Sequence, residues 1–188
     1  MSMIVETLRD TDVVEPTRPD SYEILDGKIV ECPPMSKFAA GITLRLAARL
    51  LSFVESHDLG RLESEALFQL PEPFDRSRKP DVMFFSYDRW PKNSFEDRVA
   101  DAWVAVPDLA VEVVSPNDKA DDLMEKVREY FLSGVRLVWV VYPRWGTVHV
   151  FDSFTKVRGL DRTDILDGGD ILPGFTLPLA TLLPEPTN

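Results

Sequence analysis

An acidic residue inside an apolar segment is the feature of this sequence that points most directly to chemistry. Glu112 interrupts residues 109–114, which are otherwise all apolar. Burying an unpaired carboxylate costs on the order of several kcal/mol, so Glu112 needs a cation, a proton or an opening of the sheet. A structural alternative remains, in which Glu112 is paired with an arginine or lies on the solvated face of an edge strand.

A second carboxylate, Asp81, follows Pro80 at the start of another short apolar segment upstream of Glu112. Taken alone, Asp81 is also typical of an ordinary turn or cap. Two carboxylates held close together repel each other unless a cation lies between them, and hard oxygen ligands favour Mg²⁺ or Mn²⁺. Asp81 and Glu112 together therefore indicate a candidate site for a divalent cation.

Two further charged residues are candidates for the same site. Glu65 shares a strand face with Glu63 in the predicted strand 62–70, and a solvated face is the alternative explanation for both. Lys126 falls at the border of the apolar stripe of a predicted helix, which consists of Leu123, Val127, Tyr130 and Phe131. Its stem can run along the core and deliver the ammonium toward the sheet, or it can form an exposed i,i+4 pair with Asp122.

The elements that must position these residues follow from periodicity and turn signals. Asp26-Gly27 predicts a type I′ hairpin in residues 22–31, and Ser36 is a plausible N-cap for an amphipathic helix. In chain order we expect a hairpin at 22–31, a helix at 36–57, strands at 62–70, 81–85 and 109–114, a helix at 118–133, and strands at 135–141 and 147–151. A helix between two buried strands implies a right-handed βαβ crossover, hence an α/β fold with a mixed sheet.

Composition limits the classes of function. The chain of 188 residues suits one compact domain, expected at residues 21–184 after a flexible N-terminal arm at 1–20. A net charge of −11 argues against a protein that coats DNA nonspecifically. No apolar run is long enough to span a bilayer. The N-terminus has no secretion signal and Cys32 is the single cysteine, so we expect a cytoplasmic protein.

Several segments together resemble a known family. They are YEILDGKIVE from residue 22, KPDV from 79, PDLAVEVVSP from 107, DLMEKVREY from 122 and GVRLVWVVYP from 134. This combination resembles a large family of small bacterial proteins described as restriction endonucleases of the PD-(D/E)XK nuclease superfamily. The resemblance covers residues 21 to 180, and the segment from Pro107 to Pro143 is its most specific part.

The resemblance implies a restriction-endonuclease-like core, with a mixed central sheet flanked by helices, and a Mg²⁺-dependent endonuclease site. Asp81 matches the aspartate of the PD motif and Glu112 the acid of the (D/E)XK motif, so that Asp81, Glu112 and the carbonyl of Val113 would ligate Mg²⁺, with Mn²⁺ as an alternative. Lys126 matches a helical lysine before a tyrosine, and Glu65 an upstream glutamate. DNA is the expected substrate, no membrane is expected as a partner, and many proteins of this superfamily are homodimers.

One position departs from the motif. The lysine of E-x-K stands two residues after the acid, and here that position holds Val114. Lys126 could supply the missing charge from the following helix. The alternative is a catalytically inactive protein with a nuclease fold that binds nucleic acid or a protein partner without cutting, which the acidic balance of the chain also favours.

Overall fold

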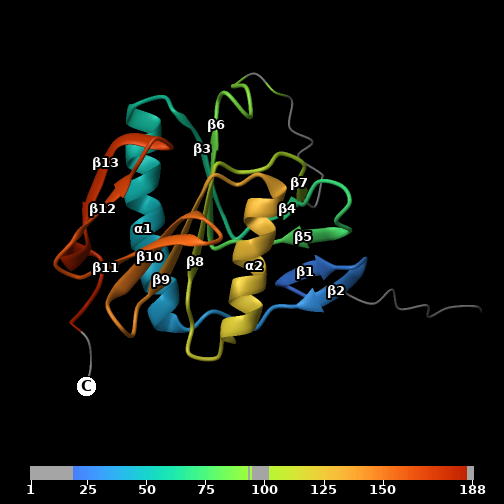
Figure 1. Cartoon of the computed structure of the whole chain (residues 1–188), viewed down its shortest axis with the longest axis horizontal. Coiled ribbons are helices and arrows are strands. Elements are labelled where there is room, and N and C mark those ends of the chain that lie inside the picture. The colour runs from blue at the N-terminus through green and yellow to red at the C-terminus, as the bar shows by residue number, and fades with distance from the viewer. Residues whose placement is uncertain (1–18, 93, 95–101, 186–188) are drawn as a thin grey trace, which may run out of the picture.

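The computed structural model describes residues 19–92, 94 and 102–185. Its centre is a six-stranded sheet with the order β11-β10-β9-β8-β6-β3 (Figure 1). The strands are β3 (Gly60–Ser64), β6 (Val82–Ser86), β8 (Leu109–Val113), β9 (Leu137–Tyr142), β10 (Thr147–Ser153) and β11 (Lys156–Asp161). β8 runs parallel to β9 and antiparallel to β6. The expected mixed sheet, with the segment containing Glu112 at its centre, is therefore confirmed.

Two helices cover the two faces of this sheet, α1 (Lys37–Ser56) and α2 (Ala120–Ser133). Successive side chains of a strand point to opposite faces, and those of β8 enter two separate hydrophobic clusters. Leu109, Val111 and Val113 pack with α1, whereas Ala110 packs with α2. Figure 1 shows the helices on either side of β8 and β9. The strand–helix–strand unit β8-α2-β9 accordingly matches the expected crossover between parallel strands.

The helix ends follow local hydrogen bonding. Ser36 caps α1, as predicted, by accepting a hydrogen bond from the backbone N–H of Ala39. α2 begins at Ala120 rather than at the predicted residue 118, because the Asp118 carboxylate accepts the backbone N–H of Ser115 and closes a turn before the helix. Gly134 ends α2 with a φ of 97°, a left-handed conformation that glycine adopts without steric cost.

A second sheet lies beside α2, with the order β2-β1-β5-β4-β7. Its strands are β1 (Tyr22–Leu25), β2 (Lys28–Glu31), β4 (Leu67–Gln69), β5 (Arg76–Arg78) and β7 (Ala102–Trp103). β1 and β2 form the predicted hairpin, and the positive φ angles of Asp26 and Gly27 (52° and 71°) fit its type I′ turn. β7 falls in the segment 86–107, for which the sequence predicted no regular structure, and residues 93 and 95–101 lie outside the described part.

The predicted single strand at 62–70 is wrong. Glu65 has a φ of 55° and separates β3, in the six-stranded sheet, from β4, in the second sheet. Leu62 and Phe68, which would share one face of a single continuous strand, instead lie apart: Leu62 packs against the α1 cluster and Phe68 belongs to the α2 cluster. This break moves Glu65 out of any strand and next to the residue that precedes β6.

The C-terminal segment completes the core on the α1 side. It forms β12 (Ile165–Gly168), β13 (Leu172–Pro178) and the short 3₁₀ helix η1 (Leu179–Thr181). Its apolar side chains belong to the α1 cluster, namely Leu172, Phe175, Leu177, Leu179, Leu182 and Leu183. An apolar C-terminal segment could cover a core or form an interface, and here it covers the core.

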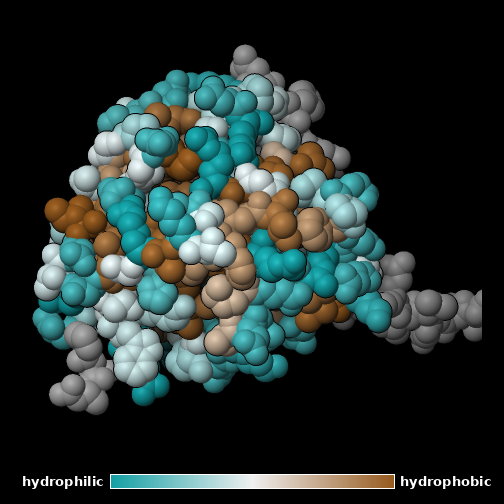
Figure 2. All heavy atoms as spheres, in the orientation of Figure 1, coloured by the Kyte–Doolittle hydropathy of each residue, from teal (hydrophilic) through white to brown (hydrophobic). Residues whose placement is uncertain are grey.

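Of the proposed arm at residues 1–20, residues 1–18 lie outside the described part of the chain. Figure 2 shows hydrophobic residues exposed along α2, next to a hydrophilic area over the side of the molecule that carries the hairpin β1–β2. None of the helices in the described residues is both long and apolar enough to cross a membrane.

Candidate metal and phosphodiester site

Strand register brings Asp81 and Glu112 together. Val82 of β6 pairs with Val111 of β8 in an antiparallel ladder. Asp81 precedes Val82 and Glu112 follows Val111, so the two acids face each other one position beyond that pair, and the N–H of Asp81 donates to the carbonyl of Val111 at 3.0 Å. Opposite residues of antiparallel strands have Cβ atoms about 4.5–5.5 Å apart. Strand alternation also puts both side chains on the face of the sheet that α2 covers.

The carboxylate of Asp81 is partly buried among few compensating partners. It accepts one hydrogen bond from the backbone N–H of Val113. Burial raises the pKa of Asp81 well above its ordinary value, and the negative charge of Glu112 raises it further, whereas the Val113 hydrogen bond lowers it only in part. Asp81 thus lacks a counter-charge sufficient for its ionised form, which is the condition that a bound divalent cation relieves.

Glu112 has two partners, and both come from α2. The hydroxyl of Tyr130 donates to its Oε1, and Nζ of Lys126 lies 3.7 Å from its Oε2. Burial raises the pKa of Glu112, and the opposing effects of Lys126 and Tyr130 are too small to restore it. Glu112 is 7% exposed. No arginine side chain in the described residues binds Asp81 or Glu112, so the arginine-paired alternative for Glu112 is wrong.

Lys126 extends into the site rather than into solvent. Its Nζ lies 2.9 Å from Oε1 of Glu23, closer than it lies to Glu112, and its side chain is only 21% exposed. Asp122, the alternative partner, is instead 3.8 Å from Lys119. Although burial would lower the pKa of Lys126, the negative charges of Glu112 and Glu23 raise it. Lys126 therefore stays protonated and bridges two carboxylates from different sheets.

Glu23 belongs to a buried ionic network that the sequence did not reveal. Its Oε2 lies 2.8 Å from Nη1 of Arg78, and its Oε1 accepts the backbone N–H of Lys79. Arg78 also binds Glu129 at 2.6 Å, and Arg76 binds the other oxygen of Glu129. The network connects the hairpin, β5 and α2. Two patterns in the sequence hint at this network, an acidic residue inside a hairpin strand (Glu23) and the three-residue spacing of Lys126 and Glu129. Neither pattern identifies the oppositely charged residues with which these side chains pair.

Glu65 lies beside Asp81 at the β3–β4 junction. Its backbone N–H donates to the carbonyl of Asp81 at 3.3 Å, and its charge contributes to the raised pKa of Asp81. Its carboxylate, however, lies 2.9 Å from Nζ of Lys79. Arg45 and Arg49 are exposed on α1 and thus on the other side of the sheet from the two acids, too far round the molecule to contact a phosphate held there.

The donor set fits Mg²⁺ better than a metal held by protein ligands alone. Among the described residues, no group of three or more His, Cys, Asp or Glu side chains is arranged to hold a metal ion. The carboxylates of Asp81 and Glu112 are hard oxygen ligands, and Mg²⁺ usually keeps several waters and binds through one or two carboxylates. The two acids are therefore the residues that could hold such an ion.

Comparisons with known proteins agree with the expected family. The family described as "Putative restriction endonuclease" (Uma2) matches residues 8–180. A solved structure described as a putative nuclease belonging to DUF820, from Anabaena variabilis, superposes with a TM-score of 0.74 at 20% identity, over 86% of this chain and 88% of that one. That likeness shows a shared fold. No curated protein matches the chain. Because the family match extends over most of its length, the chain belongs to the Uma2 family of putative restriction endonucleases.

Proposed function

We propose that this protein is a metal-dependent endodeoxyribonuclease that hydrolyses phosphodiester bonds of DNA. The observation that carries the proposal is the pairing of Asp81 with Glu112 across β6 and β8, with the ammonium of Lys126 beside Glu112. The family description and the fold shared with a protein described as a nuclease support the same class of reaction.

Asp81, Glu112 and the carbonyl of Val113 would hold the Mg²⁺ ion, with Mn²⁺ as an alternative. When bound there, the ion polarises a phosphate oxygen and lowers the pKa of a coordinated water. Two features of the protein suit this role. The Val113 N–H fixes one oxygen of Asp81 and leaves the other for the ion. The Tyr130 hydroxyl fixes Oε1 of Glu112, and Oε2, which lies 3.7 Å from Nζ of Lys126, would face both that ammonium and the ion.

Lys126 would orient the attacking water or stabilise the negative charge that develops on the phosphate. Its raised pKa keeps it cationic at neutral pH, and it replaces the strand lysine that is Val114 in this chain. Glu65 would hold a second ion or a metal-bound water, which requires it to release Lys79. These roles place one cation and one further carboxylate around the pair formed by Asp81 and Glu112.

The second candidate function is binding of nucleic acid or a protein without cleavage. The observation that favours it is the position of Lys126, whose ammonium lies nearer to Glu23 than to Glu112, at 2.9 Å against 3.7 Å. A lysine held by Glu23 supports the structure of the domain whether or not a phosphate is bound. Val114 at the motif position is consistent with the same view.

A cleavage assay separates the two functions. Plasmid and single-stranded DNA are incubated with Mg²⁺ or Mn²⁺ and with wild type, Asp81→Ala, Glu112→Ala and Lys126→Ala. We expect the two acid variants to lose activity by about two or more orders of magnitude, since metal binding is lost, and Lys126→Ala to lose nearly as much. Asp170→Asn and Lys156→Ala, at exposed sites of the β12–β13 turn and of β11, serve as charge-matched controls and keep wild-type activity.

Equal cleavage by all variants identifies a contaminating nuclease and refutes the site. No cleavage by the wild type, together with metal binding that depends on Asp81 and Glu112, favours the second candidate. Metal binding is measured by isothermal titration calorimetry without DNA, so that result does not depend on the choice of substrate.

A further inference from the structure

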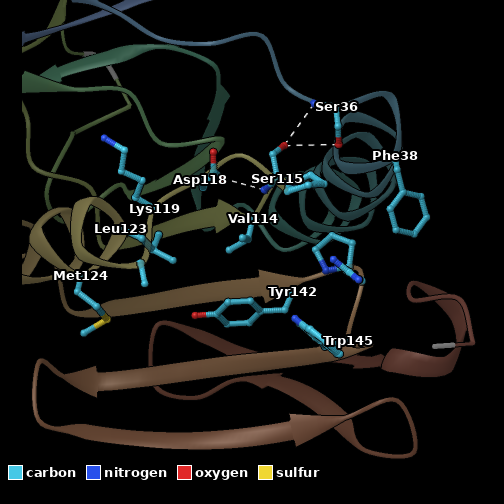
Figure 3. Close-up of a pocket in the computed structure, with 14 residues that line it drawn as sticks. Ser36, Phe38, Val114, Ser115, Asp118, Lys119, Leu123, Met124, Tyr142 and Trp145 are labelled. Atoms are coloured by element: carbon cyan, nitrogen blue, oxygen red, sulfur yellow. Dashed lines mark hydrogen bonds between the residues drawn. The ribbon is translucent and has the colours of Figure 1, made fainter. Parts of the chain in front are cut away.

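A pocket of about 270 Å³ lies where the end of β8, the start of α2 and the β9–β10 turn meet. In Figure 3, Tyr142 and Trp145 lie on one side of it, and Val114 and Ser115 lie across from them. Leu123 and Met124 of α2 form one end, and Phe38 of α1 lies at the other. Three aromatic residues, one from α1 and two from the end of β9 and its turn, thus surround one open space, which has the size for a single planar ring system rather than for a large cofactor.

The aromatic side chains of this pocket are unusually exposed. Trp145 is 64% exposed, and Phe38 is also among the exposed large hydrophobic residues. The guanidinium of Arg144 lies 5.2 Å from the centroid of the Trp145 ring, a cation–π contact that holds the two side chains together. Trp145 contributes little to the core, so packing within the protein does not explain why a tryptophan stands at this position. A stacking partner from outside the protein does explain it.

Two cations at the pocket are available to a phosphate. Arg144 forms no ion pair with a carboxylate in the described residues, and Lys119 lies 3.8 Å from Asp122 in a fully solvated pair that holds it weakly. The acid of the pocket, Asp118, is occupied in part by the backbone N–H of Ser115. In a chain with a net charge of −11, the pocket thus combines aromatic rings with two cations that no buried carboxylate of the described residues holds.

The pocket is lined by residues that lie close along the chain to Glu112 and Lys126. Val114 lines it and stands two residues after Glu112, on the same face of the strand and about 6–7 Å further along. Leu123 also lines it and precedes Lys126 by three residues, which makes the two neighbours on one helix face. The pocket therefore adjoins the residues that follow Glu112 on the strand and precede Lys126 on the helix.

We infer that this pocket holds an unstacked base of single-stranded DNA, next to the phosphate that the proposed function assigns to Asp81 and Glu112. The inference rests on that proposed function. A base stacks on Trp145 and Tyr142, while Arg144 and Lys119 contact the adjoining phosphates. A base inside a duplex is already paired and stacked and cannot enter without being extruded, so the substrate class is single-stranded or locally unpaired DNA.

The test measures binding without cleavage. Fluorescence anisotropy is recorded in EDTA with a labelled single strand, the matching duplex, and an abasic single strand that keeps the phosphates but lacks the bases. We expect Trp145→Ala to weaken binding of the normal single strand about tenfold, within the range for loss of stacking on one base. Trp145→Phe keeps most of the affinity, because a ring remains.

The matched controls are exposed residues of the same kind at the β10–β11 turn. Phe154→Ala removes an exposed ring (38% exposed) and Lys156→Ala an exposed cation, and both keep wild-type affinity. Arg144→Ala and Lys119→Ala each reduce the salt dependence of binding by about one phosphate contact. For the abasic strand, wild type and Trp145→Ala bind equally weakly.

Equal binding of the single strand by wild type and Trp145→Ala overturns the inference, as does equal affinity for the duplex or for the abasic strand. A protein that binds no DNA, or whose Trp145 surface binds only another protein, overturns it too. The two proposals fail separately. If DNA is cut but Trp145→Ala binds like wild type, the pocket assignment fails and the proposed function stands. If Trp145-dependent binding occurs but no DNA is cut with Mg²⁺, the proposed function fails and the base pocket stands.

Discussion

Asp81 and Glu112 face each other across two antiparallel strands, and the negative charge of Glu112 raises the pKa of Asp81, which burial has already raised. The fold thus holds two carboxylates near each other at a cost in electrostatic energy. A divalent cation between them removes that cost, and this relation generates the first two predictions.

Mg²⁺ should stabilise the wild-type protein at neutral pH. A ligand present at a hundredfold excess over its Kd stabilises the native state by about 2.7 kcal/mol, which corresponds to a rise in Tm of about 5–10 °C for a chain of this length. Differential scanning calorimetry with and without Mg²⁺ measures it. Asp81→Asn should show no rise and the control Asp170→Asn, in the exposed β12–β13 turn, the full rise, whereas an equal rise in all three proteins means that the ion binds elsewhere.

Without metal, stability should fall as the pH rises. An acid whose pKa is raised in the folded state binds more protons when folded than when unfolded, so its favourable contribution is present below its ordinary pKa, which is 3.8 for Asp81, and is lost as the pH rises through the folded value. Chemical denaturation in EDTA, at a series of pH values from below 3.8 upward, measures the slope of the free energy of unfolding against pH. Asp81→Asn should flatten it, and an unchanged slope would remove Asp81 as its source.

Tyr130→Phe should weaken metal binding at the site without creating a cavity in the core. The ring stays in the α2 cluster, but Glu112 loses the hydroxyl that donates to Oε1. Loss of one hydrogen bond to a buried charged group costs about 1.5–3 kcal/mol. The pKa of Glu112 should rise further, because the Tyr130 hydrogen bond lowers it at present. Metal binding should then require a higher pH, which calorimetric titrations at several pH values detect.

Lys126 and Glu23 should be coupled in stability but not in catalysis. Lys126→Met leaves the buried Glu23 with one cation fewer and should cost about 3–5 kcal/mol. The double variant Lys126→Met with Glu23→Gln should recover part of this loss, because no uncompensated charge is left on Glu23. Urea denaturation of the wild type, Lys126→Met, Glu23→Gln and the double variant gives the four free energies of unfolding from which the coupling energy between the two residues is calculated. Cleavage should stay absent in the double variant, and recovered cleavage would show that Lys126 acts only through structure.

Arg78→Met should destabilise the protein strongly. Arg78 lies between Glu23 and Glu129, and all three side chains are buried, so its removal leaves two buried carboxylates short of a partner, at a cost of about 3–5 kcal/mol. The matched control is Arg158→Met, which breaks the half-exposed pair with Asp167 and should cost about 1 kcal/mol or less. Similar losses in both variants would contradict the role of burial.

Local patterns in the sequence predicted much of the fold. The type I′ turn at Asp26-Gly27, the cap at Ser36 and the stop at Gly134 depend on residues next to them in the chain, and all three are present. The central position of the strand with Glu112 followed from its apolar neighbours. The break at Glu65 was missed because the two halves of residues 62–70 join different sheets, and no local preference records which sheet a strand joins.

Residue types alone nominated Asp81, Glu112, Lys126 and Glu65. Only the tertiary structure decided their surroundings. Period-two alternation placed Glu112 on one face of β8, but the register with β6 set it opposite Asp81, and the packing of α2 brought Tyr130 and Lys126 to it. Glu23 and Arg78 escaped prediction because charged residues of a hairpin and a short strand become buried only when α2 packs against them. Burial and pairing across long sequence separations are properties of the assembled chain, since the free energy that fixes them comes from contacts absent in any single segment.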